Sequence, residues 1–118
     1  MNSIEELRFE AYDALERIWF LQTVEEREHT DISLSLRLHI RPGLFIQLFC
    51  GQRTNSLFFA LVEHGERVFG MDRERDQWHI HPFGSATEHQ PVTEDVGPRP
   101  FFEFLAMVET LLVSRDLL

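Results

Sequence analysis

The chain has no lysine, a single cysteine and no long hydrophobic run. All eleven basic residues are arginines, so a Walker-type phosphate loop, which needs a lysine, is excluded. Cys50 has no second cysteine to pair with, which favours a reducing compartment, and we expect a cytoplasmic protein. The longest apolar run, Leu57 to Val62, is far shorter than the roughly 20 residues of a membrane span, so no membrane partner is expected.

Motifs of several enzyme classes are also missing. The chain contains no Gly-x-Gly-x-x-Gly and no Gly-x-Ser-x-Gly, which argues against dinucleotide redox chemistry and serine-hydrolase chemistry. With 118 residues, the chain has the length of one domain, and we expect a single domain over residues 1–118. Its 43% of hydrophobic residues allow a core that needs no disulfide to hold it together.

Negative charge is in excess but unevenly distributed. The net charge is −9 overall, which argues against non-specific nucleic-acid binding over the whole surface. Residues 1–31 carry a net charge of −6 and residues 88–118 carry −4, whereas residues 32–87 carry +1 and four of the six histidines. We therefore expect an anionic ligand to bind the middle segment.

Both ends of the chain have the apolar periodicity of helices. Ser3 and Glu6 match a capping box, which satisfies backbone donors at a helix start, and the spacing predicts a helix over residues 3–17. Near the other end, apolar residues recur at i, i+3, i+4 and i+7, which predicts a helix over residues 101–115.

The segment between the helices has the period of strands. Leucines and isoleucines alternate with polar residues from Ile32 to Arg41, which is typical of a half-buried strand. Further short strands are predicted at close spacing, over residues 18–28, 44–50, 57–63, 67–72 and 78–83. The spacing leaves no room for crossover helices, so residues 18–83 form an antiparallel meander, followed by a long loop over 84–100. The predicted fold class is α+β, with five to six antiparallel strands and both helices packed on one face.

The densest polar group lies at the end of this meander. His79 and His81 are two residues apart on a predicted strand, so both rings point to one face, and Asp72 lies across a short turn. Two imidazoles and a carboxylate can transfer protons near neutral pH. Arg73 or Arg75, in the predicted turn, can bind a phosphoryl group and stabilise its charge. The pattern predicts metal-independent phosphodiester cleavage with Asp72, His79 and His81 as catalytic residues.

Two other interpretations of these residues stay open. His79 and His81, with Asp72 or His89, also match the ligand set of a divalent metal such as zinc. Alternatively, the histidines lie on a solvated sheet face beside a charged hairpin tip and have no chemical role.

A second basic group lies on an earlier strand. Arg37, His39 and Arg41 alternate with buried positions, so all three are expected on one side of that strand. Such a group is typical of the wet face of a half-covered sheet. If this face adjoins the two later histidines, Arg41 becomes a further substrate-binding residue.

Several of these segments resemble a known family. They are Arg67-Val68-Phe69-Gly70-Met71-Asp72, then Trp78-His79-Ile80-His81-Pro82-Phe83, then Glu88-His89 and a C-terminal helix rich in leucine and glutamate. Over roughly residues 56–112 the chain resembles the TumE-like family of small toxin–antitoxin-associated proteins. Asp72 matches the acid of the family pattern, and His79 and His81 match its histidine-rich strand, whereas Gly70-Met71 replaces the expected Arg-Tyr. The resemblance implies a toxin of a type II pair, with an antitoxin protein as its partner.

Two functions from different classes are thus predicted. The first is a toxin-like ribonuclease that acts on RNA by histidine acid–base chemistry and needs no cofactor. The alternative is a non-catalytic module that binds a protein partner or forms a homodimer through the sheet and the apolar C-terminal helix.

Overall fold

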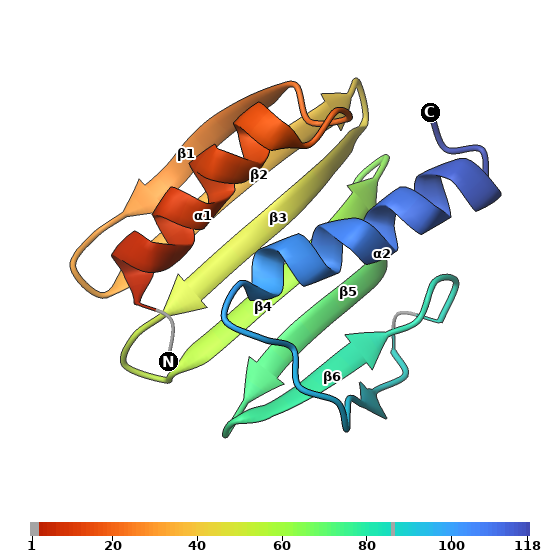
Figure 1. Ribbon diagram of the computed structural model, residues 1–118. Helices are drawn as coiled ribbons and strands as arrows, with labels where there is room; N and C mark the ends of the chain where they lie inside the picture. Colours follow the sequence, from red (N-terminus) through yellow and green to blue (C-terminus); the bar gives the residue numbers. More distant parts are fainter. Residues whose placement is uncertain (1–2, 86) are drawn as a thin grey trace.

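The fold consists of an antiparallel sheet covered on one face by two helices (Figure 1). The computed structural model describes residues 3–85 and 87–118. The sheet has seven strands in the order β1-β2-β3-β4-β5-β6-β7, so each strand pairs with its neighbour in the sequence. This arrangement confirms the predicted α+β class and the meander. The strands are β1 (Thr23–His29), β2 (Ser33–Arg41), β3 (Leu44–Gly51), β4 (Ser56–Glu63), β5 (Glu66–Glu74), β6 (Gln77–His81) and β7 (Gln90–Pro91).

The N-terminal helix α1 (Ile4–Arg17) begins at the predicted capping box. The Ser3 side chain accepts a hydrogen bond from the Glu6 backbone N–H, and the Glu6 side chain accepts one from the Ser3 N–H. Two backbone donors that have no partner within the helix are thereby satisfied. The buried face of α1 packs over β1, β2 and β3, as Figure 1 shows.

The C-terminal helix α2 (Pro100–Ser114) begins without a side-chain cap of its own. Its N-cap residue is Arg99, which has no capping oxygen, and a proline occupies the first turn. A carboxylate from α1 takes the place of the cap, because Glu10 accepts a hydrogen bond from the Phe102 N–H at 2.9 Å. The two helices are therefore joined at the start of α2.

The hydrophobic core lies between the helices and the sheet. Every second residue of β2, from Leu34 to Ile40, is buried towards the helices, which confirms the strand read from the alternation. At the centre, the ring of Phe59 on β4 lies 5.1 Å from that of Phe101 and 5.5 Å from that of Phe104. Burial of these apolar side chains supplies most of the stabilisation, at roughly 25 cal/mol per Å².

The other face of the sheet, called the open face below, carries no helix among residues 3–85 and 87–118 (Figure 1). It mixes half-buried aromatic rings with polar side chains, and its residues are those that alternate with the core positions. Phe49 of β3 and Phe58 of β4 stack on it with ring centroids 5.3 Å apart.

The structure corrects three parts of the predicted organisation. The strand expected over residues 18–28 begins only at Thr23. The turn expected over residues 73–77 contains only Arg75 and Asp76, whose positive φ angles of 51° and 63° suit a two-residue hairpin turn. The long loop expected over 84–100, of which residue 86 lies outside the described part, holds the two-residue strand β7. This short strand raises the total above the five or six that were predicted. Within the described residues, neither helix combines the length and apolar character needed to span a membrane.

Candidate functional site: a histidine cluster on the open face

The predicted site residues of β5 and β6 come together on the open face. Asp72 pairs directly with His79, and Gly70 pairs with His81, in the antiparallel register of these strands. Directly opposed residues of an antiparallel pair point to the same face, so all three polar side chains project away from the helices. The sequence prediction that His79 and His81 share a face with Asp72 is confirmed.

The Asp72 carboxylate lies between two imidazoles. Its Oδ2 atom is 2.6 Å from Nε2 of His81, and its Oδ1 atom is 3.7 Å from Nδ1 of His79. The His81 side chain is only 5% exposed, whereas that of His79 is 26% exposed. Asp72 therefore holds His81 at the base of the site and faces His79 nearer to solvent.

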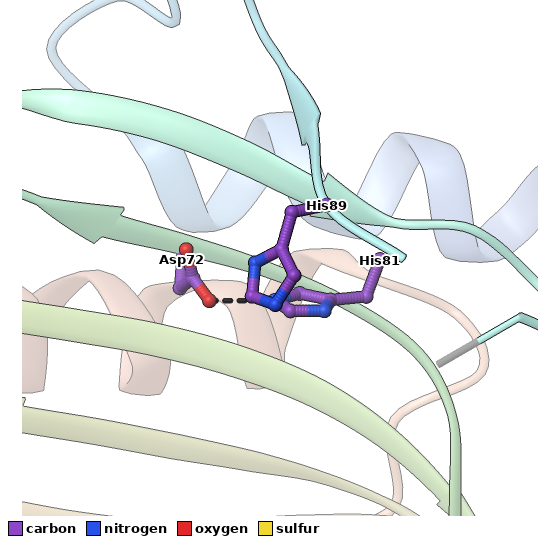
Figure 2. A group of neighbouring side chains, drawn as sticks. All are labelled: Asp72, His81 and His89. Carbon is purple, nitrogen blue, oxygen red and sulfur yellow. Dashed lines mark hydrogen bonds and ion pairs between the residues drawn. The ribbon is translucent and has the colours of Figure 1, made fainter. Parts of the chain in front are cut away.

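A third imidazole reaches the same place from the loop after β6. Figure 2 shows the ring of His89 lying over His81, and their centroids are 4.3 Å apart. The His89 ring is 6.1 Å from that of His79, at nearly a right angle. His89 is exposed and directly precedes β7, which pairs Gln90 with Ile80. The pairing of β7 with β6 brings His89 to the sheet. We refer to Asp72, His79, His81 and His89 as the histidine cluster.

The position of His89 beside His81 and His79 was not predicted from the sequence, in which His89 was considered only as a possible metal ligand. The local feature that could have revealed this position is strand β7 at Gln90 and Pro91. A strand of two residues is too short to be recognised from sequence periodicity. Its approach to His81 depends on a chain reversal within a loop of no regular period.

One of the predicted substrate-binding arginines lies beside the cluster. Arg75, in the β5–β6 turn, and His79 line one hollow of about 580 Å³ on the open face. The other lining residues are Thr54, Ser56, Glu74 and Gln77. A bound anionic group in this hollow can contact both the guanidinium and the imidazole.

Arg73 does not join the cluster, contrary to expectation. It pairs with Leu57 and Trp78, both of which point towards the helices, and its guanidinium lies 5.5 Å from the centre of the Trp78 ring. Arg73 is 8% exposed. Because β5 continues through Arg73 as a strand, its side chain points to the face opposite that of Asp72.

Arg41 also lies elsewhere. The β2–β3 register shifts between His39 and Arg41, so Arg41 pairs with the buried Leu44. Its guanidinium donates to the Leu117 carbonyl oxygen at 2.8 Å and to the Glu63 carboxylate at 3.2 Å. A β-bulge at the end of β2 thus breaks the alternation on which its predicted position depended.

Cys50 behaves as a buried apolar residue. Its side chain is part of the core at 4% exposure, and burial raises the pKa of the thiol. A buried thiol with a raised pKa is a poor nucleophile at neutral pH.

Comparisons of the chain with protein-family models, with curated proteins and with solved structures found no match. The resemblance to the TumE-like family therefore stays a prediction, and the chemistry of the histidine cluster is argued from its geometry alone.

Proposed function

We propose that the histidine cluster cleaves phosphodiester bonds in RNA by acid–base catalysis, without a metal. The observation that carries this proposal is the Asp72 carboxylate set between His81 and His79, with the exposed His89 ring 6.1 Å from His79. Two accessible imidazoles at this separation can both contact one bound group, and imidazole takes up and releases protons near neutral pH.

RNA is the favoured substrate because it supplies its own nucleophile. The cluster consists of groups that transfer protons, and a ribose 2′-hydroxyl can attack the adjacent phosphorus once its proton is removed. One accessible imidazole accepts this proton as the oxygen–phosphorus bond forms. The other donates a proton to the 5′-oxygen as its bond to phosphorus breaks. The products are a 2′,3′-cyclic phosphate and a free 5′-hydroxyl, and no external co-reactant is consumed.

The four residues have different roles. His79 and His89 are exposed enough to touch substrate, so we assign them as the catalytic acid and base. His81 is nearly buried and bonded to Asp72, so these two are positioning residues rather than groups that reach the substrate. This division differs from the expectation that His79 and His81 form the acid–base pair. Arg75, beside His79 in the hollow, stabilises the charge on the phosphate.

The aromatic rings of the open face support a single-stranded substrate. Phe58 pairs directly with Asp72 and stacks on Phe49, so a half-exposed aromatic surface adjoins the cluster. Bases of single-stranded RNA stack on such rings at about 1–3 kcal/mol per base, with little dependence on sequence.

The test is cleavage of a fluorescent single-stranded RNA in the presence of EDTA. We expect the double variant His79→Ala, His89→Ala to lose about 10²-fold or more of the rate. His39→Ala is the matched control, because His39 also faces a carboxylate, that of Glu25 at 3.0 Å, but lies on β2 away from the cluster. Full activity in a folded double variant, or equal loss in the control, contradicts the proposal.

The resemblance to the TumE-like family extends this proposal to a cytoplasmic toxin held in check by an antitoxin protein. Expression of the wild-type chain without a partner is then expected to arrest bacterial growth. Expression of the same double variant at equal protein level is expected to leave growth unchanged, and arrest by both proteins contradicts the toxin role.

A further inference from the structure

Three side chains of the histidine cluster have the donor set of a transition-metal site. One ligand atom from each of Asp72, His81 and His89 lies within 4.8 Å of the others. The set contains two imidazole nitrogens and one carboxylate oxygen. Such mixed ligands suit Zn²⁺ and neighbouring divalent ions, whereas Mg²⁺ and Ca²⁺ prefer oxygen ligands alone.

We infer that Asp72, His81 and His89 bind one divalent transition-metal ion, and that this ion switches the proposed ribonuclease off. The first half of the inference stands on the donor geometry. The second half rests on the proposed function, because it concerns the same His89 ring that we assign to proton transfer.

Two of the three ligands are held in place before any metal arrives. Asp72 and His81 lie on paired strands and contact each other at 2.6 Å, so the sheet holds the two side chains next to each other. His79 contacts the other oxygen of the Asp72 carboxylate and helps to orient it. Outer contacts of this kind hold metal-binding carboxylates and imidazoles in a productive orientation.

The third ligand has the freedom to close the site. Zinc holds such ligands at about 2.0–2.2 Å, which places neighbouring ligand atoms roughly 3.3–3.5 Å apart. Zinc binding therefore requires the spread of up to 4.8 Å to shrink and the 2.6 Å contact between Asp72 and His81 to lengthen. The exposed His89 side chain is the ligand with room to move. Only three protein ligands are supplied, so at least one coordination position remains for water.

The bound ion and proton transfer compete for the same atoms. A metal-bound nitrogen of His89 no longer has a lone pair for the proton of a 2′-hydroxyl. The ion also replaces the hydrogen bond between Asp72 and His81. Metal binding is therefore expected to inhibit RNA cleavage, and a chelator is expected to restore it.

The experiment measures binding and activity separately. Full-length protein, freed of metal with EDTA and dialysed, is titrated with zinc chloride in a calorimeter, and the visible spectrum is recorded with cobalt chloride. We expect 1:1 binding, a higher melting temperature, and at least tenfold weaker binding in His89→Ala and in Asp72→Asn. His39→Ala is the control, because His39 contacts the Glu25 carboxylate in an ion pair outside the histidine cluster. This variant is expected to bind zinc like the wild type.

Each outcome separates the inference from the proposed function. No binding at millimolar zinc, or binding that survives His89→Ala undiminished, overturns the metal site whatever the RNA assay shows. One-to-one binding that does not slow an active ribonuclease overturns the inhibitory role. If zinc binds through His89 while the EDTA-treated protein cleaves no RNA, the metal site is supported and the ribonuclease proposal fails.

Discussion

At the scale of single residues, the chemistry of the open face depends on one carboxylate with two imidazole neighbours. The oxygens of Asp72 face His81 at 2.6 Å and His79 at 3.7 Å. The hydrogen bond to Asp72 fixes the orientation of the buried His81 ring, and the carboxylate places a negative charge next to the accessible His79 ring. Removal of this single charge therefore tests positioning without removing either imidazole.

We predict that Asp72→Asn lowers kcat for RNA cleavage by about 10²-fold and leaves KM nearly unchanged, because Asp72 orients the cluster without touching the substrate. Steady-state kinetics on a defined oligonucleotide checks both constants. Asp76→Asn removes an exposed carboxylate four residues away, in the hairpin turn, and is the matched control. A variant that changes KM alone would instead place Asp72 in direct substrate binding.

At the scale of elements, two carboxylates of α1 contact the start of α2, and their pKa values are shifted in opposite directions. Glu10 is buried where it accepts the Phe102 N–H, and burial raises the pKa of its carboxyl despite that hydrogen bond. One turn away, Asp13 lies between Arg99 and Arg17, and hydrogen bonds from these guanidinium groups lower the pKa of the Asp13 carboxyl. The same helix thus carries two carboxylates whose ionisation affects stability with opposite sign.

The two carboxylates predict opposite pH effects on stability. The pKa of Glu10 is higher in the folded state than in the unfolded state. Glu10 therefore stabilises the fold at pH values below its unfolded-state pKa, and this contribution is lost as the pH rises through its folded-state pKa. The free energy of unfolding of Glu10→Gln, relative to wild type, should therefore rise between pH 4 and pH 7.

Asp13→Asn supplies the comparison of opposite sign. In the wild type the pKa of Asp13 is lower in the folded state than in the unfolded state. The ionised carboxylate therefore stabilises the wild type at neutral pH, and this contribution disappears as the pH falls through the folded-state pKa of Asp13. The deficit of Asp13→Asn should therefore shrink towards pH 3. Urea unfolding at several pH values measures both differences, and pH-independent differences would contradict the assignment.

At the scale of the whole molecule, the two faces of the sheet have different surroundings. The face covered by α1 and α2 is buried in the hydrophobic core. The open face carries the histidine cluster, Arg75 and the stacked rings of Phe49 and Phe58. Residues 32–87, which contain β2 to β6, carry a net charge of +1, whereas residues 1–31, which include β1, carry −6 and residues 88–118 carry −4. An anionic chain is therefore directed to the open face, provided that no other protein covers it.

We predict that the purified chain is a monomer of 14.0 kDa in solution, since the proposed ribonuclease needs the open face free. Light scattering after size-exclusion chromatography measures the mass directly. A stable dimer that becomes monomeric in Phe58→Ser would show that this face is an interface, and would favour the alternative function as a dimerisation module. Phe9→Ser, which changes an exposed phenylalanine on α1, is the control for general loss of apolar surface.

Local patterns were sufficient to predict most of the fold. The capping box at Ser3 and Glu6, the alternation along β2 and the helical spacing of α2 each depend on residues within one element. That Asp72 lies within reach of the two histidines was also predicted. Its pairing with His79 was not, because the turn expected over 73–77 would have paired Asp72 with Trp78, and the actual turn contains only Arg75 and Asp76. The same reasoning was wrong for Arg73, which was expected in the turn but continues β5 and points towards the helices.

What the amino-acid sequence determined by itself is therefore the set of elements apart from β7, their order and the shared face of Asp72, His79 and His81. The tertiary structure alone decided that His89 lies over His81, that Arg41 turns towards Leu117, and that Glu10 caps α2. The physical reason is range. Periodicity and capping act between residues a few positions apart, whereas a bulge, a loop reversal and a cap from another helix arise only when distant segments pack together.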